Sequence, residues 1–163
     1  MNRNYIITCA ALLAAAAMTH SCNTAGCTDN QNSIPLAGFY LASTGEAVAV
    51  DSLEVWGVGA PGDSALYSPG DPLSQIYLPL RSTAASTSFC FHYTMKLLSD
   101  PAFNDTITLT YTSTPYFASE ECGAMYRYTI TGLTHTSHLI SSVEVTDSII
   151  TNTDRQRLKI YFR

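Results

Sequence analysis

Hydrophobic and polar residues alternate through much of this chain with a period of two, which is typical of β-strands. The clearest case is "DTITLTYTS" at 105–113, in which Ile107, Leu109 and Tyr111 lie opposite the threonines. The last residues, "RLKIYFR" at 157–163, alternate in the same way and place Leu158, Ile160 and Phe162 on one face. Both segments are predicted to be strands with one face in a core.

Other segments show the same alternation: "AVAVDSLEVWGV" (47–58), "QIYLPL" (75–80), "TSFCFHYTMK" (87–96), "AMYRYTI" (124–130) and "LISSVEV" (139–145). In 87–96 one face carries Phe89, Phe91, Tyr93 and Met95. Turn residues at 61–63, 69–72 and 131–132 separate the segments. We therefore predict an all-β fold, an antiparallel immunoglobulin-like β-sandwich of about seven to nine short strands. "Immunoglobulin-like" describes the architecture only, because the Cys–Trp–Cys pattern of true immunoglobulin domains is missing.

The first 21 residues have a different character. One basic residue, Arg3, precedes "YIITCAALLAAAAM" at 5–18, fourteen residues without a charge. This is the pattern of a secretory signal, and the run is shorter than the roughly 18 apolar residues that a membrane-spanning helix needs. "THSC" at 19–22 follows and resembles a relaxed lipobox, which predicts a lipid on Cys22. Cleavage after Ala17 is the alternative, and it would leave Cys22 as a plain thiol.

The predicted organisation is a cleaved signal peptide over 1–21, a lipid-anchored linker over 22–32 and a β-sandwich domain over 33–163. Export places Cys27, Cys90 and Cys122 in an oxidising compartment, where disulfides persist. Cys90 lies within a predicted strand, whereas Cys27 and Cys122 lie in loop-like sequence. We therefore predict a Cys27–Cys122 disulfide. The alternatives are that all three thiols are reduced or that Cys90 takes part.

Charge and composition fit an exported domain. The chain has 8 Lys and Arg against 13 Asp and Glu, a net charge of −5. Proteins that bind nucleic acid usually carry a basic patch, so this balance argues against that class of partner. Serine and threonine occupy 37 positions and supply the polar faces of the strands.

Candidate chemistry is sparse. "GDSAL" at 62–66 resembles a hydrolase serine block, but the downstream Asp-x-x-His of that family is absent. His135 and His138 are two potential metal ligands, fewer than zinc usually takes from a protein. Glu120 and Glu121 are adjacent, so in a strand they would point to opposite faces. We therefore predict no catalytic residues, no metal site, no cofactor and no enzymatic activity.

Three tyrosines offer a candidate ligand face: Tyr77, Tyr126 and Tyr128. Exposed aromatic rings on a sheet could stack against the rings of a glycan. The alternative is that these side chains cover a second core face or line the edge of the sandwich.

The segments "CTDNQNSIPLAGFY", "IYLPL", "YTSTPYFASEECG" and "LKIYF" together resemble a family of Bacteroidota lipoproteins that is catalogued as a domain of unknown function. The resemblance covers nearly all of the mature chain and implies location and fold, with no catalytic residues to carry over. It also implies O-glycosylation at the triplet of Asp, then Ser or Thr, then an apolar residue or Thr. Four positions match this triplet: Ser52, Ser64, Thr106 and Ser148. The alternative is that Asp-Ser pairs simply begin strands after turns.

These observations predict a lipoprotein anchored to the outer membrane, on either its periplasmic or its outer face. Its expected role is that of a non-enzymatic binding or structural module of the cell envelope. The expected partners are the membrane, through the lipid, and a glycan or another envelope protein. Two alternatives stay open: a glycan-binding surface protein that uses the exposed tyrosines, and an unrecognised envelope hydrolase.

Overall fold

The computed structural model of the protein describes residues 33–120 and 123–163. The predicted signal peptide (1–21) and lipid-anchored linker (22–32) therefore lie outside the described residues. No helix in the described part of the chain is long and apolar enough to cross a membrane.

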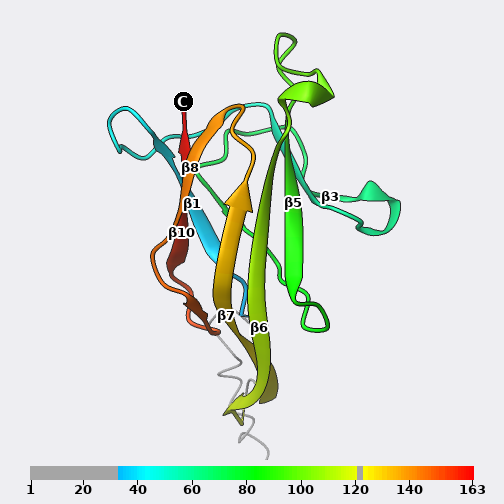
Figure 1. Cartoon of the computed structure of the whole chain (residues 1–163), viewed down its shortest axis with the longest axis vertical. Coiled ribbons are helices and arrows are strands. Elements are labelled where there is room, and N and C mark those ends of the chain that lie inside the picture. The colour runs from blue at the N-terminus through cyan, green and yellow to red at the C-terminus, as the bar shows by residue number, and fades with distance from the viewer. Residues whose placement is uncertain (1–32, 121–122) are drawn as a thin grey trace, which may run out of the picture.

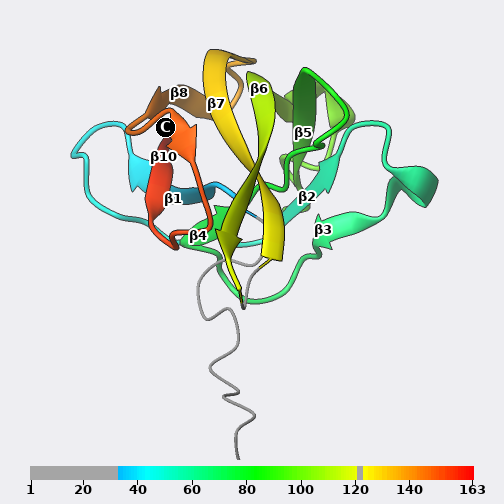
Figure 2. The ribbon, with the colours of Figure 1, turned by 90° about the horizontal axis from the view of Figure 1, so that it is seen from below.

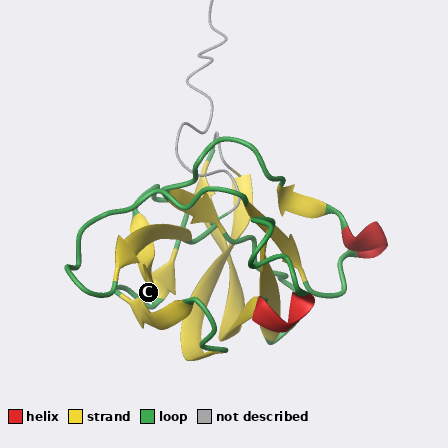
Figure 3. Ribbon diagram, turned by 90° about the horizontal axis from the view of Figure 1, so that it is seen from above, coloured by secondary structure: helices red, strands yellow, loops and turns green. Residues whose placement is uncertain are grey.

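Two β-sheets pack face to face in the described residues, and the predicted all-β sandwich is confirmed (Figures 1 and 2). The four-stranded sheet has the order β4-β1-β10-β8 and consists of β1 (Leu36–Leu41), β4 (Gln75–Tyr77), β8 (Ile140–Val145) and β10 (Gln156–Phe162). The six-stranded sheet has the order β3-β2-β5-β6-β7-β9 and consists of β2 (Leu53–Gly57), β3 (Ala65–Tyr67), β5 (Ser86–Tyr93), β6 (Asp105–Ser119), β7 (Gly123–His135) and β9 (Ile149–Ile150). Two single 3₁₀ turns, η1 (Pro61–Asp63) and η2 (Pro101–Phe103), lie in loops (Figure 3).

The core lies between the sheets and is built from the faces that alternation predicts. Ile107, Leu109 and Tyr111 of β6 are buried, as are Leu158, Ile160 and Phe162 of β10. The ring centroids of Phe39 on β1 and Phe162 on β10 lie 5.1 Å apart in an edge-to-face arrangement, which packs two neighbouring strands together. In β5 the prediction holds for Phe89, Phe91 and Tyr93, but it is wrong for Met95, which is exposed because the strand ends at Tyr93.

The strands differ from the prediction in number, length and direction. The described residues contain ten strands rather than seven to nine, and two of them, β6 and β7, have 15 and 13 residues. The sheets are not wholly antiparallel either, because β1 pairs with β10 in parallel. Parallel neighbours need a long connection, and here nearly the whole domain separates the two strands.

The predicted turn at 131–132 is wrong, because both residues lie inside β7. Gly132 pairs with Thr110, while the next paired residues are Ile130 and Tyr111, so Thr131 is an extra residue in a β-bulge. Glycine within a strand often marks such a bulge, and sequence alone does not separate that role from a turn.

The hairpin of β6 and β7 extends beyond the strands beside it (Figure 1). β5 pairs with β6 only along residues 105–110, and β9 pairs with β7 only at Tyr128 and Thr129. Pro115 therefore lies in a part of β6 with one free edge, where its missing N–H interrupts no ladder. We refer to the two-stranded end formed by residues 114–119 and 123–127 as the hairpin arm.

The opposite end of β6 is fixed by a buried carboxylate. Asp105 has 0% exposed surface and accepts hydrogen bonds from the Tyr93 hydroxyl at 2.9 Å and the Thr136 hydroxyl at 2.8 Å. The backbone N–H groups of His138, Leu139 and Ile140 donate to the same carboxylate, each at 2.8 Å. These bonds join β5, β6 and the connection from β7 to β8, which crosses from one sheet to the other.

Candidate functional site

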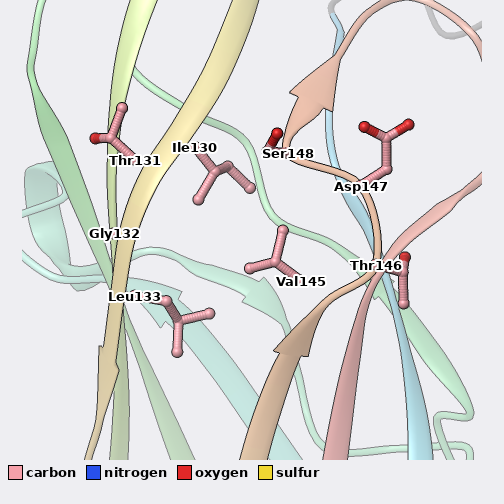
Figure 4. Close-up of a pocket in the computed structure, with 8 residues that line it drawn as sticks. All are labelled: Ile130, Thr131, Gly132, Leu133, Val145, Thr146, Asp147 and Ser148. Atoms are coloured by element: carbon pink, nitrogen blue, oxygen red, sulfur yellow. The ribbon is translucent and has the colours of Figure 1, made fainter.

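The candidate site is a groove between β7 of one sheet and β8 of the other (Figure 4). Its volume is about 540 Å³. The side chains of Ile130, Leu133 and Val145 occupy the space between the two strands, whereas Thr146 and Asp147 point away from β7. Ser148 lies at the end of this space, whereas the Thr131 side chain lies on the other side of β7 (Figure 4). The groove therefore has an apolar floor and a serine at its margin.

Both long sides of the groove are sheet edges. β8 pairs with β10 on one side and with no strand of the described chain on the other. β7 pairs with β6 along its length, but β9 covers only Tyr128 and Thr129, and one further bond joins the Ile130 N–H to the Ser148 carbonyl. Residues 131–135 of β7 thus have an outer edge with no neighbouring strand. An unpaired edge presents a row of backbone donors and acceptors that can bind another strand.

The connection from β8 to β9 closes one end of the groove and is held by a charged cluster. The Asp147 carboxylate pairs with the guanidinium groups of Arg155 and Arg157 and accepts the Ile149 N–H at 2.9 Å. The Ile149 hydrogen bond, aided by the two arginines, holds the pKa of Asp147 below its ordinary value. Asp147 is therefore an ionised acceptor that anchors the connection, and it is poorly suited to exchange protons near neutral pH.

Arg157 is unusual in this cluster because it is buried, with 3% exposed surface. Its Nη1 binds Asp147, but its Nε has no hydrogen-bond partner among the described residues. Burial, together with the nearby Arg155, lowers the pKa of Arg157, and Asp147 opposes that shift. A buried arginine paired with one carboxylate depends strongly on that partner, so Asp147 and Arg157 hold β8, β9 and β10 together as a unit.

The three tyrosines predicted as a ligand face do not form one. Tyr77 lies on β4 in the four-stranded sheet, and its hydroxyl donates to Asp154 at 2.9 Å. Tyr126 and Tyr128 lie on β7, but Tyr128 is only 4% exposed and packs edge-on against Tyr111 in the core. The prediction of a shared exposed face is wrong because the hairpin carries Tyr128 into the sandwich, and only Tyr126 is exposed.

The predicted O-glycosylation positions all lie at the starts of strands. Ser52 directly precedes β2, Ser64 precedes β3, Ser148 precedes β9, and Thr106 is the second residue of β6. Ser64 and Ser148 are exposed, while Ser52 and Thr106 are half-buried. This placement agrees with the alternative explanation of the triplets. It also makes Ser64 and Ser148 the more accessible positions for a modifying enzyme.

Of the cysteines that bear on the predicted disulfide, only Cys90 lies in the described chain. It is a free thiol, buried on β5 opposite Trp56 and Thr106. Burial raises the pKa of the Cys90 thiol, although a hydrogen bond with Asn104 opposes this. Cys22, Cys27 and Cys122 lie outside the described residues, so lipidation and the Cys27–Cys122 disulfide stay predictions.

Cysteine and histidine side chains are common in catalytic sites, and the described chain places Cys90, His92 and His135 as follows. Cys90 and His92 share a face of β5, and His92 Nδ1 lies 2.8 Å from Asn104 Oδ1. A catalytic thiol needs a lowered pKa, whereas that of Cys90 is raised. His135 Nδ1 is bound to the Thr136 carbonyl at 2.6 Å. Within residues 33–120 and 123–163, no three His, Cys, Asp or Glu side chains lie together in a way that could hold a metal ion.

The groove itself was missed by sequence reasoning. The alternation of polar and apolar residues predicts that Val145 lies on an inward strand face. For Ser148 the sequence predicts only a candidate modification site. Nothing local to either residue shows that β7 and β8 end up as facing sheet edges. That depends on which strands pair, and the pairing is long-range.

One comparison with known proteins gives a match. Residues 52–162, more than half of the chain, match a family model described as "Family of unknown function (DUF6452)". No curated protein and no solved structure matches the chain. The matched range begins beside β2 and leaves out β1, although β1 lies between β4 and β10 in the four-stranded sheet.

Proposed function

We propose, from the premise that the chain belongs to the DUF6452 family of unknown function, that it is a non-enzymatic binding module of the cell envelope. A lipid on Cys22 would hold it at the outer membrane of a bacterium of the Bacteroidota. The N-terminal sequence supports the anchor, since an apolar run too short to span a bilayer ends just before a cysteine. Several acyl chains on one residue give stable attachment.

The binding site in this proposal is the groove between β7 and β8, and its ligand is an extended peptide segment of another envelope protein. The observation that carries the proposal is the pair of unpaired sheet edges beside an apolar floor. An extended peptide can add to such an edge through its backbone, while alternate side chains enter the groove. Ile130, Leu133 and Val145 would contact the inward side chains of the peptide.

The chemistry of the groove favours binding over catalysis. Its titratable side chain, Asp147, is bound by two arginines and a backbone N–H, and its pKa is lowered. The other polar side chains of the lining are the hydroxyls of threonine and serine. No neighbouring base in the described lining would activate them as nucleophiles.

Peptide display tests the proposal. A library of extended peptides with alternating apolar positions would be selected against the protein, and the dissociation constants of enriched peptides would be measured. Val145→Trp, which fills the space between β7 and β8, should weaken binding at least tenfold. Val58→Trp is the matched control, because Val58 is an exposed valine that follows β2, which lies away from β7 in the six-stranded sheet. Enriched peptides that bind both variants equally well, or no enrichment at all, would refute the groove as the site.

A further inference from the structure

The hairpin arm carries an apolar strip that nothing in the described chain covers. Pro115 pairs with Tyr126, and Phe117 pairs with Ala124, so these four residues lie on one face of the arm. All four are exposed, with Phe117 at 68% and Tyr126 at 42%. An exposed cluster rich in aromatic residues is a common mark of an interaction surface.

The arm is held in place by its other face. The Tyr116 hydroxyl donates to Asn152 at 3.1 Å, and the Arg127 guanidinium lies 5.1 Å from the centre of the Tyr116 ring. Met125, opposite Tyr116, is buried. An isolated two-stranded hairpin is only marginally stable in water, so these contacts matter for keeping the apolar strip in a fixed orientation.

The arm lies at the end of the molecule where the described chain begins (Figure 1). Leu36 at the start of β1 pairs with Gln156 at the start of β10, and the loop that leads into β10 contains Asn152, the partner of Tyr116. The opposite end carries the C-terminus and the loop after β5, where Leu97 is 88% exposed. The hairpin arm therefore lies at the end of the sandwich where the described chain begins, and Leu97 lies at the opposite end.

We propose that the apolar strip of the hairpin arm rests on the lipid surface to which Cys22 attaches the chain. This inference depends on the anchor in the proposed function. Residues 23–32 separate Cys22 from the described chain, and when fully extended they span roughly 35–40 Å. A tether of ten residues can be no longer than this, so it keeps the arm close to the bilayer.

The side chains of the strip suit the headgroup region of a membrane. Tyrosine is enriched there because its ring is apolar and its hydroxyl is polar, and phenylalanine adds apolar area. Glu120, exposed at the end of β6, would be repelled by an anionic surface. The partner that fits best is therefore a zwitterionic lipid surface, such as one rich in phosphatidylethanolamine.

Depth-dependent fluorescence quenching tests this orientation. The full lipidated protein would be reconstituted into vesicles of phosphatidylethanolamine and phosphatidylcholine, with and without brominated phosphatidylcholine. Trp56, the one tryptophan of the chain, is replaced by phenylalanine. Phe117→Trp then reports on the arm, and Leu97→Trp is the matched control at the opposite end. We expect the brominated lipid to quench emission from position 117 at least twofold and to leave position 97 unchanged.

Flotation of the vesicles separates the possible outcomes. Protein that floats but shows no greater quenching at 117 than at 97 overturns the orientation and leaves the anchor intact. Protein that does not float overturns the anchor and this inference with it. If Trp56→Phe unfolds the protein, the same two variants are made with Trp56 retained, and its constant emission is subtracted.

Discussion

The five hydrogen bonds to Asp105 make this residue the sharpest test of how the two sheets are joined. Oδ1 accepts from the Thr136 hydroxyl and the His138 N–H, and Oδ2 accepts from the Tyr93 hydroxyl and from the N–H groups of Leu139 and Ile140. Every partner is a donor. Asp105→Asn keeps the size of the side chain but replaces one oxygen with an NH₂ group, which cannot accept.

The expected loss follows from that geometry. If the amide oxygen of the asparagine takes the place of Oδ2, the NH₂ group faces the His138 N–H and leaves that donor unsatisfied. A buried donor without a partner costs about 1–3 kcal/mol, and hydrogen bonds to a charged acceptor contribute more than those to a neutral one. We expect Asp105→Asn to lower the free energy of unfolding by about 3–4 kcal/mol at pH 7.

The pH dependence provides a second readout. Burial alone would raise the pKa of Asp105, but hydrogen bonds from Ile140, His138, Leu139 and Thr136 outweigh it and hold the pKa below its ordinary value. A lowered pKa in the folded state means that the carboxylate stabilises the fold at pH values above its unfolded pKa of about 3.9. That stabilisation is lost as the pH falls through the still lower folded pKa. The difference between wild type and Asp105→Asn should therefore shrink below about pH 4.

Urea unfolding at pH 7, 5 and 3.5 measures both effects. Asp154→Asn is the matched control, because Asp154 also accepts a tyrosine hydroxyl, that of Tyr77, but is exposed. Its replacement should change the free energy of unfolding by less than about 0.5 kcal/mol. The reasoning fails if Asp105→Asn is as mild as this control, or if its cost is the same at every pH.

Three further predictions concern the termini and the surface. Cys22→Ser should release the protein into the soluble envelope fraction or stall its processing, and fractionation that finds the variant membrane-bound and normally trimmed would contradict lipidation. Cys27→Ala should cost about 2–4 kcal/mol if Cys27 and Cys122 are bridged, and thiol labelling of the denatured, unreduced protein should then find Cys90 as the free cysteine. Labelling of both Cys27 and Cys122 would exclude the bridge. Glycopeptide mass spectrometry of protein from native cells should find O-glycans at one or more of the four triplet sites, which are Ser52, Ser64, Thr106 and Ser148. Recovery of all four peptides without a glycan would rule out this modification.

The inward faces of the strands could be read from the sequence because burial is decided locally by the period of two. Ile107 and Leu158 are fully buried, as the alternation around them predicts. The ends of the strands could not be read in this way. β6 continues past 113 through Pro115 to Ser119, because the partner strand β7 pairs with it as far as Ser119 and the proline lies at a free edge. The length of β6 depends on its pairing with β7, and the local sequence of β6 does not reveal that pairing.

The candidate site was unpredictable for a related reason. Tyr126 and Tyr128 look alike in the sequence and lie on the same face of β7, yet one is exposed and the other is in the core. The difference arises because the core-facing side of the hairpin continues beyond the end of the sandwich. Tyr128 still packs on Tyr111, whereas Tyr126 belongs to the arm. Only the position of the neighbouring strands separates the two residues.

Both proposed surfaces have the same structural origin, the length of β7 relative to β9. β9 has two residues and pairs with Tyr128 and Thr129, near the middle of the 13 residues of β7. It therefore divides the outer edge of β7 into two unpaired stretches, 123–127 in the hairpin arm and 131–135 beside the groove. The Asp147 cluster fixes β9 at this position through the Ile149 N–H. A shift of β9 along β7 by two residues would keep its side chains on the same faces, and it would lengthen one surface while shortening the other. The ion pair of Asp147 with the buried Arg157 thus sets the dimensions of the proposed peptide groove and of the proposed membrane-facing arm together.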